Sequence, residues 1–444
     1  MKSIYVIFMI LYLDLIAFTI ILPLFPSIIE FYDNKEQTST TKDGSLRQIH
    51  DCMEWFKTTL GMPDRRRYNN VLVGGILGSI FSLLQFICSP TIGFLSDVLG
   101  RKKVLVFSML GTLTSYFIWW KSETFTLFLV SRIVGGLLKG SVTIATTMMS
   151  DVTNKENRGK GMAFIGLGFS LGFITGPMIG AYFVSKAKVD TLTHAFALPA
   201  QVAMVIQLVA LLATVFLLDE TIGEKKEFDV KALISKIWSY TNPISLLWGG
   251  KSSGKSSKTL HQFTIINFIY LLIFSGLEFT LTFVTHERFN FTSMQQGKLF
   301  LFAGIIMMLV QGGYVRRMKH RNEKKIAIQG MFAMIPAMIT IAFASTVRYT
   351  YIALALYSFG AGTVVPCLTA LFSQHSENIN SGENIGIFRS AGALARAIAP
   401  FVTCTLYWSL GSVSCYLIGA GLFILPLFLL SRVSVESEEE KKSK

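Results

Sequence analysis

Twelve long apolar stretches divide the sequence, and they constrain its fold more than any other feature. Each is about 20 residues long, the length of α-helix that crosses a hydrocarbon layer of about 30 Å. The spanning segments must be helical, because lipid offers no partner to unpaired backbone groups. The predicted spans cover residues 4–29, 70–94, 104–121, 125–149, 161–185, 199–218, 263–287, 294–315, 325–345, 348–373, 384–408 and 411–431. The sequence therefore predicts an all-α membrane protein with twelve helices.

The distribution of charge supports this prediction and indicates an orientation. Only 15% of the 444 residues are charged, and the mean hydropathy is +0.51. The net charge of +14 is also typical of nucleic-acid-binding proteins, but the lysines and arginines lie mainly in loops between the apolar stretches. The basic loops follow the second, fourth, sixth and eighth spans, which places them in the cytoplasm by the positive-inside rule. We therefore predict a multi-pass protein of the plasma membrane or an internal membrane, with both termini cytoplasmic and no nucleic-acid partner.

A segment rich in Lys, Ser and Gly separates the sixth span from the seventh. It divides the chain into an N-terminal six-helix half over residues 1–218, a cytoplasmic linker over 219–262, a C-terminal six-helix half over 263–432 and a cytoplasmic tail over 433–444. Residues 249–256 match the spacing of a phosphate-binding loop, but no strand precedes them. We therefore interpret the segment as a flexible linker.

The loop over residues 30–69 is long and lies on the opposite side of the predicted membrane. Its apolar residues Leu46, Ile49, Met53, Phe56 and Leu60 recur at helical spacing. This pattern predicts a short amphipathic helix that packs over the outer ends of the spans.

The loop between the second and third spans carries the most specific motif of the chain. Residues 93–104 read GFLSDVLGRKKV. Glycine lets a backbone turn sharply, Asp97 can accept hydrogen bonds from a helix N-terminus, and the basic residues suit the cytoplasmic side. The loop resembles the signature G-x-L-S-D-x-x-G-R-[KR] of the major facilitator superfamily. The candidate residues of this cytoplasmic gate loop are Gly93, Asp97, Gly100, Arg101 and Lys102.

A second motif lies in the fifth span. Residues 172–180 read GFITGPMIG and resemble the superfamily motif G-x-x-x-G-P-x-x-G, which is regarded as a gate in drug/proton antiporters. Small residues allow two helices to approach closely, and proline removes one backbone donor. We expect this face to pack on a helix of the other half. The residues assigned to this helix-packing gate are Gly172, Gly176, Pro177 and Gly180.

Longer segments are similar to the tetracycline-transporter-like transporters of animals, a branch of the same superfamily. They lie at residues 132–140, 274–289, 295–298 and 389–396, so the resemblance extends over nearly the whole chain. It implies the twelve-helix major facilitator fold, with two six-helix halves around a central cavity. It also implies transport by alternating access and efflux of organic anions.

Ionisable residues inside the spans are the candidates for a substrate and proton pathway, because charges in lipid are costly and usually face water. Arg132 and Lys139 are seven residues apart, which places them on nearly one face of the fourth span. Arg389 and Arg396 repeat this spacing in the eleventh span. These four cations compare with only two candidate carboxylates, Asp14 and Glu278. This excess of positive charge favours an anionic substrate. The candidate pathway residues are Asp14, Arg132, Lys139, Glu278 and Arg396.

The sequence leaves the roles of these residues open. Arg132 could pair with Asp14 and hold two helices together, or it could act directly in transport. Arg389 is near the cytoplasmic end, so its side chain is expected to extend toward the interface, and Arg396 is the stronger candidate for substrate contact. Glu278 is the candidate proton site, because a carboxyl group in a cleft of low polarity can take up a proton near neutral pH.

The predicted function is secondary active transport of a small molecule, an organic anion, with protons as the candidate coupling ion. One alternative is export of cationic or neutral drugs such as tetracycline-like compounds, with Asp14 or Glu278 binding the ligand. Another is a non-transporting receptor or sensor on a transporter fold. The sequence contains no nucleophile–base arrangement and no cluster of metal ligands. We therefore expect a monomer in the lipid bilayer, with no enzyme activity, cofactor or metal.

Overall fold

The computed structural model describes residues 2–24, 28, 31–32, 34–35, 44–59, 61, 66–154, 157–186, 192–222, 255–291, 293–317, 322–376 and 381–433. All regular secondary structure in these ranges is helical. Most of the predicted linker and nearly all of the predicted tail lie outside the described residues. Their boundaries therefore stay predictions.

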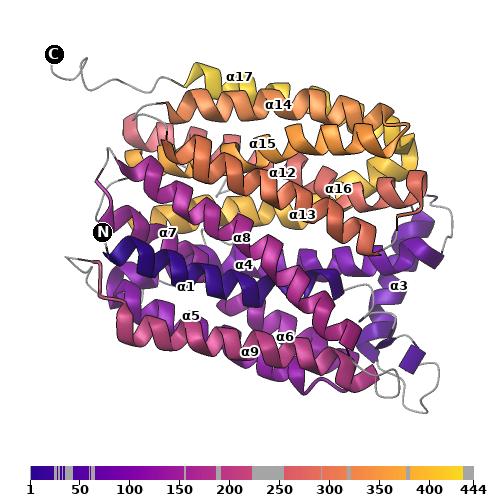
Figure 1. The fold of residues 1–444 in the computed structure, drawn as a ribbon, viewed down its shortest axis with the longest axis horizontal. Helices are drawn as coiled ribbons and strands as arrows, with labels where there is room; N and C mark the ends of the chain where they lie inside the picture. Colours follow the sequence, from indigo (N-terminus) through magenta and orange to yellow (C-terminus); the bar gives the residue numbers. More distant parts are fainter. Residues whose placement is uncertain are drawn as a thin grey trace.

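The first half of the chain forms one bundle of helices, coloured indigo to magenta in Figure 1. Its elements are α1 (Lys2–Thr19), η1 (Leu22–Leu24), α3 (Gly44–Thr59), α4 (Arg66–Leu99), α5 (Arg101–Trp120), α6 (Phe125–Leu138), α7 (Ser141–Val152), α8 (Arg158–Lys186) and α9 (Leu192–Leu217). Two apolar clusters hold it together, one around Phe128 and Ala203 and the other around Ile10 and Met148.

The second half forms a second bundle beside the first, drawn in orange and yellow in Figure 1. Its elements are α12 (Lys255–Phe289), α13 (Ser293–Leu309), the π-helix η4 (Val310–Val315), α14 (Glu323–Phe343), α15 (Val347–His375), α16 (Ser381–Leu422) and α17 (Ile424–Arg432). One large apolar cluster around Phe263, Met334 and Tyr416 forms its core. Most apolar residues thus gather within each half, and a smaller cluster of Phe86, Ala391, Ala393 and Leu394 joins α4 to α16 across the halves.

A helix occupies the position of every predicted span, so the prediction of an all-α membrane protein is confirmed. Nine helical segments in the described ranges are long and apolar enough to cross a membrane, and the last of them, Glu383–Arg432, contains two predicted spans. The two remaining predicted spans are the first and the third. The first corresponds to α1, a shorter apolar helix, and the third corresponds to α5.

The long helix α16 contains the reversal between the last two spans. Several residues of α16 contact α12. In order along α16, they are Gly392 with Leu271, Thr403 with Gly276, Ser412 with Arg288 and Gly419 with Leu277. The contacts advance along α12 before Gly411 and return along it afterwards. Gly411 has φ 81°, a left-handed conformation that glycine adopts readily. This residue therefore ends one crossing and begins the next.

Two predicted spans are not regular α-helices in the structure. The fourth span was expected as one helix over residues 125–149, but it breaks between Leu138 and Ser141 into α6 and α7. The eighth span changes from α-helix to π-helix at Val310. Broken helices inside a membrane protein commonly form binding sites for ions and substrates, because they present free backbone groups.

The two ends of the bundle differ in their chemistry. We call the end that carries Asp97, Arg101, Asp151, Glu220 and Glu383 the charged end. Helix α1 begins there, because its residues advance alongside those of α8, which starts at this end. Helix α17 ends there, where Lys324 donates hydrogen bonds to the carbonyl groups of Ser431 and of Val433, the residue after the helix. The described chain therefore starts and finishes at the same end, as an even number of crossings requires (Figure 1).

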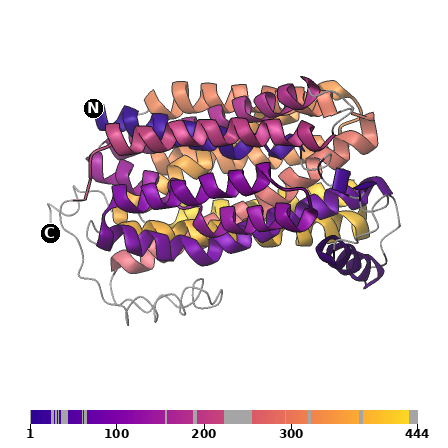
Figure 2. The ribbon, with the colours of Figure 1, turned by 90° about the horizontal axis from the view of Figure 1, so that it is seen from below.

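The predicted amphipathic helix is confirmed as α3, at the opposite end of the bundle (dark indigo in Figure 2). Leu46 and Met53 are buried in the apolar cluster of the first half, and Ser45 and Thr126 share a hydrogen bond that joins α3 to the start of α6. Helix α3 thus covers the helix ends on this side.

Candidate functional site

A buried ion pair joins α1 to the break in the fourth span. Asp14 is fully buried, and its carboxylate lies 2.6 Å from the ammonium group of Lys139, which is only 3% exposed. Ser141 also donates a hydrogen bond to this carboxylate, over 2.7 Å, and Gln207 donates another over 3.1 Å. All the donors come from the first half of the chain, so the site belongs to that half.

The helix break explains why this pair forms here. Lys139 caps the C-terminus of α6, where carbonyl groups favour a cation, and Asp14 lies at the N-terminus of α7, where N–H groups favour an anion. The hydroxyl of Ser108 on α5 donates to the carbonyl of Leu138 and accepts from the backbone N–H of Gly140. These two bonds satisfy backbone groups that the break exposes.

Arg132 does not pair with Asp14, so that interpretation of the sequence is wrong. Its guanidinium instead lies between two aromatic rings, 5.4 Å from the centre of Trp119 and 5.6 Å from that of Phe128. One of its nitrogens donates to the hydroxyl of Ser131. Arg132 and Lys139 do line one small cavity, as their spacing along the sequence indicated.

The second half carries its own polar group around Glu278. The carboxylate interacts with the hydroxyl of Tyr357 on α15 and, electrostatically, with the guanidinium of Arg396 on α16. Phe274, one turn before Glu278, stacks on the ring of Tyr357 at 5.1 Å. Glu278 and Arg396 are both partly exposed, although each lies near the middle of its helix. Three helices of the second half thus converge on this group.

Arg389 points toward the first half rather than along the helix toward its end. Its guanidinium lies 5.8 Å from the centre of the Phe169 ring on α8, so the expected extension to the interface is wrong. Arg396 follows two turns later and therefore lies on nearly the same face of α16. The two guanidinium groups interact with each other electrostatically. This face of α16 therefore carries two positive charges, of which Arg389 meets the first half.

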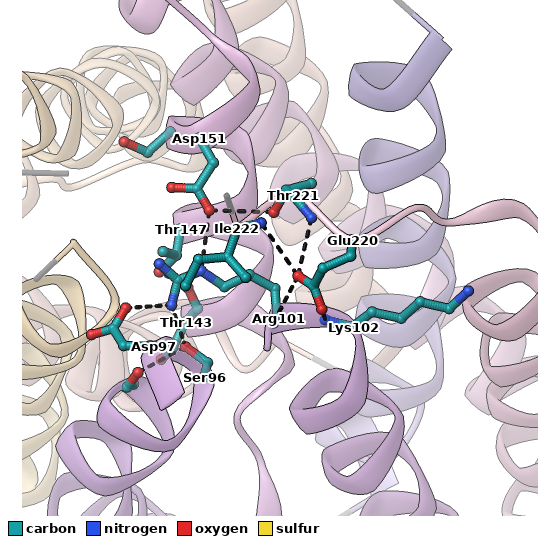
Figure 3. A network of polar contacts seen from close by, with 12 residues as sticks. Ser96, Asp97, Arg101, Lys102, Thr143, Thr147, Asp151, Glu220, Thr221 and Ile222 are labelled. Atoms are coloured by element: carbon teal, nitrogen blue, oxygen red, sulfur yellow. Dashed lines mark hydrogen bonds and ion pairs between the residues drawn. The ribbon is translucent and has the colours of Figure 1, made fainter. Parts of the chain in front are cut away.

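A network of polar side chains fixes the loop between α4 and α5 at the charged end (Figure 3). The guanidinium of Arg101 donates to Asp97 over 2.5 Å, to Ser96 over 2.8 Å and to Asp151 over 3.1 Å. Glu220 accepts hydrogen bonds from the backbone N–H groups of Arg101 and Lys102, and so caps the start of α5. Arg101 itself is fully buried.

The two glycines of this loop have different roles. Gly100 has φ 107° and makes the turn between the helices, as expected. Gly93 makes no turn, which corrects the prediction, because α4 continues to Leu99. The carbonyl of Gly93 accepts a hydrogen bond from Ser96, which in turn accepts one from Arg101.

Hydrogen bonds also join the two halves at the charged end. Asp97 accepts one of 2.9 Å from the backbone N–H of Glu383, in the first turn of α16, which is the type of bond that the sequence predicted for this aspartate. Arg158 donates to the carbonyl of Ser373 over 2.6 Å, and the Ser373 hydroxyl pairs with that of Ser150. The halves are therefore held together at this end in the conformation described.

The small-residue face of α8 packs on a different partner from the one we expected. A side chain added at Gly172, Gly176 or Gly180 would meet residues 15–20, at the end of α1 and just after it, in the same half. Thr19 of α1 donates a hydrogen bond of 2.8 Å to the carbonyl of Gly172. The expected contact with the other half is therefore wrong for these glycines. Pro177 lies in the same helix.

Sequence reasoning missed four residues that complete these networks. They are Asp151, Arg158, Glu220 and Glu383. All four lie at or just beyond helix ends, where charged residues are common and carry little information. They are far from the signature loop in the sequence, and no fixed spacing relates them to it. Only the three-dimensional structure shows that they lie close to it.

Comparison with known sequences identifies the family. Residues 5–400 match the profile of the Major Facilitator Superfamily. The chain is 37% identical to major facilitator superfamily domain-containing protein 10 of Homo sapiens, over 98% of this chain and 94% of that protein. It is 25% identical to the class C tetracycline resistance protein of Escherichia coli, over 81% of this chain and 86% of that protein.

Comparison with solved structures gives the same result. The crystal structure of the human organic anion transporter MFSD10 (TETRAN) matches with a TM-score of 0.88 at 36% identity, covering 97% of this chain and 99% of that chain. The transporter FucP in its outward conformation matches with a TM-score of 0.69 at 15% identity, covering 98% and 99%, and shares the fold. Family and fold both indicate a transporter rather than an enzyme. This chain belongs to the major facilitator superfamily.

Proposed function

We propose that the protein is a secondary active transporter that moves organic anions by alternating access. The observation that carries the proposal is the positive face of α16. No carboxylate in the described ranges lies within ion-pair distance of Arg389 or Arg396, and the two guanidinium groups repel each other. An anion bound near both would relieve this repulsion and could accept two hydrogen bonds from each guanidinium.

The cations of the first half are less suited to this role. Lys139 is neutralised by Asp14, which leaves Arg132 as the unneutralised cation of that site. The name of the human relative, organic anion transporter, supports an anionic substrate for this chain as well. The tetracycline resistance relatives motivate the alternative of a cationic or neutral drug.

Proton coupling is the second part of the proposal. Glu278 interacts with Arg396, so its charge affects how strongly that arginine attracts an anion. Protonation of Glu278 would leave the guanidinium free for the substrate, and loss of the proton would favour release. Asp14 could act in the same way on Lys139, because protonation would break their ion pair.

The charged end is proposed to face the cytoplasm, where basic loops are retained. Both ends of the described chain would then be cytoplasmic. The hydrogen bonds of Asp97 and Arg158 across the two halves would close this side while the opposite side is open. Rocking of the halves would break these bonds and reverse access to the substrate.

Replacing Arg396 with Ala is expected to raise the KM for organic anions about 10–100-fold, the equivalent of one or two hydrogen bonds to a charged group. The measurement is uptake of a fluorescent organic anion into proteoliposomes of purified protein. Arg348→Ala is the matched control, because Arg348 is exposed at the other end of the bundle. An unchanged KM, or competition by organic cations and not by anions, would overturn the choice of substrate.

Replacing Glu278 with Gln is expected to make anion flux independent of an imposed pH gradient, while exchange of anion for anion continues. The reason is that Gln keeps the shape of the side chain but cannot bind or release a proton. Glu123→Gln serves as the control, since Glu123 is exposed at a helix end. The coupling role is refuted if the Glu278→Gln variant still accumulates anion in response to the gradient.

A further inference from the structure

A small cavity lined by both apolar and charged side chains lies inside the first half, separate from the positive face of α16. Its volume is about 10 Å³, and it lies among α1, α4, α5 and α6. The lining residues are Phe18, Phe81, Thr112, Ser115, Tyr116, Arg132, Gly135 and Lys139. This volume is on the scale of one water molecule or one monatomic ion, and it is far too small for an organic substrate.

Arg132 brings an incompletely satisfied charge to this cavity. The side chain is 4% exposed, and one of its terminal nitrogens has no hydrogen-bond partner among the described residues. Trp119 and Phe128 flank the guanidinium and exclude water from its sides. A buried cation without a compensating anion is unfavourable, so a hydrogen-bond acceptor next to this nitrogen would stabilise the structure.

Three of the other polar side chains of the cavity are already engaged. Ser115 donates to the carbonyl of Ser131 over 2.7 Å, and Thr112 accepts from Gln207 over 2.8 Å. Lys139 is neutralised by Asp14, so the pair adds no net charge. The cavity therefore keeps one net positive charge, and the unpartnered terminal nitrogen of Arg132 still offers its N–H groups as a donor. A water molecule would satisfy the donor but would leave the charge.

We propose that this cavity binds a single halide ion, held by Arg132. Chloride has the charge, the size and the purely accepting character that the cavity requires. The bound ion would lie in the first half, at a distance from the organic-anion site of the second half. It would add to the stability of the α5–α6 contact and of the helix break beside it.

Thermal unfolding in detergent tests the proposal directly. At constant ionic strength, replacing gluconate with about 150 mM chloride or bromide is expected to raise the Tm by about 2–4 °C. The rise should vanish in Arg132→Gln and persist in the control Arg348→Gln, whose arginine is exposed. Equal Tm values for the wild-type protein in chloride and gluconate would overturn the proposal and indicate that water fills the cavity.

Tryptophan fluorescence gives a second test that does not need an arginine variant. The Trp119 ring is 3% exposed and its centre lies 5.4 Å from the guanidinium carbon of Arg132, so a bromide ion in the cavity would quench it. We expect a saturable component of quenching in the wild-type protein that disappears in Trp119→Phe. A purely linear dependence on bromide concentration, equal in the two proteins, would refute the site. Both tests measure halide binding and not transport, so their results would stand even if the protein did not transport organic anions.

Discussion

Replacing Asp14 with Asn is expected to lower the free energy of unfolding by about 3–5 kcal/mol, the usual cost of removing one partner from a buried ion pair. Asn can still accept a hydrogen bond from Ser141 or Gln207. It cannot neutralise the ammonium of Lys139, which would remain buried beside the ring of Phe18 at 5.0 Å. Unfolding of the purified protein by dodecyl sulfate, followed by circular dichroism, measures the loss.

Two further variants separate the loss of the ion pair from other effects of the substitution. Asp219→Asn makes the same chemical change at an exposed position and should alter stability by less than about 0.5 kcal/mol. The double variant Asp14→Asn/Lys139→Met removes both charges, and it should recover most of the stability that the single variant loses. If the single and double variants lost the same amount of stability, the unpaired charge of Lys139 would not be the cause of the loss.

The helical architecture could be predicted from the sequence because lipid permits few alternatives. A long apolar run in a bilayer must be helical, so counting such runs gave the positions of the helices. The interruptions could not be found in this way. The break before Ser141 and the π-helix at Val310 follow from local hydrogen bonds, such as those of Ser108, that an average over about 20 residues conceals.

The charged residues of the site could be predicted, but their pairing could not. Helical spacing places Arg132 and Lys139 on one face, and both do line one cavity. Which of them reaches Asp14 depends on the distance between α1 and the broken span, and spacing along one helix contains no such information. The same reason explains why Gly176 was expected to contact the other half. A face of small residues predicts close packing of two helices but does not identify the second helix.

Replacing Asp97 with Asn is expected to destabilise the closed conformation of the charged end by about 1.5–3 kcal/mol, a change of roughly 10–100-fold in its ratio to the open one. The carboxylate accepts from Arg101 with one oxygen and from the backbone N–H of Glu383 with the other. An amide retains only one accepting oxygen, so it cannot keep both bonds. Spin labels at the exposed positions 154 and 325, one on each half, would report longer distances when this end opens.

Asp151→Asn distinguishes contact between the halves from general weakening of the network. Asp151 also accepts from Arg101 of the first half and from Thr221 at the start of the linker, and neither partner belongs to the second half. Its replacement should therefore leave the distance between the labels nearly unchanged, although it removes a hydrogen bond of the same kind. If both variants lengthened the distance equally, opening would depend on the position of Arg101 and not on the bond between Asp97 and Glu383. If only Asp97→Asn did so, the hydrogen bond between Asp97 and the backbone of Glu383 would contribute directly to the stability of the closed conformation at the charged end.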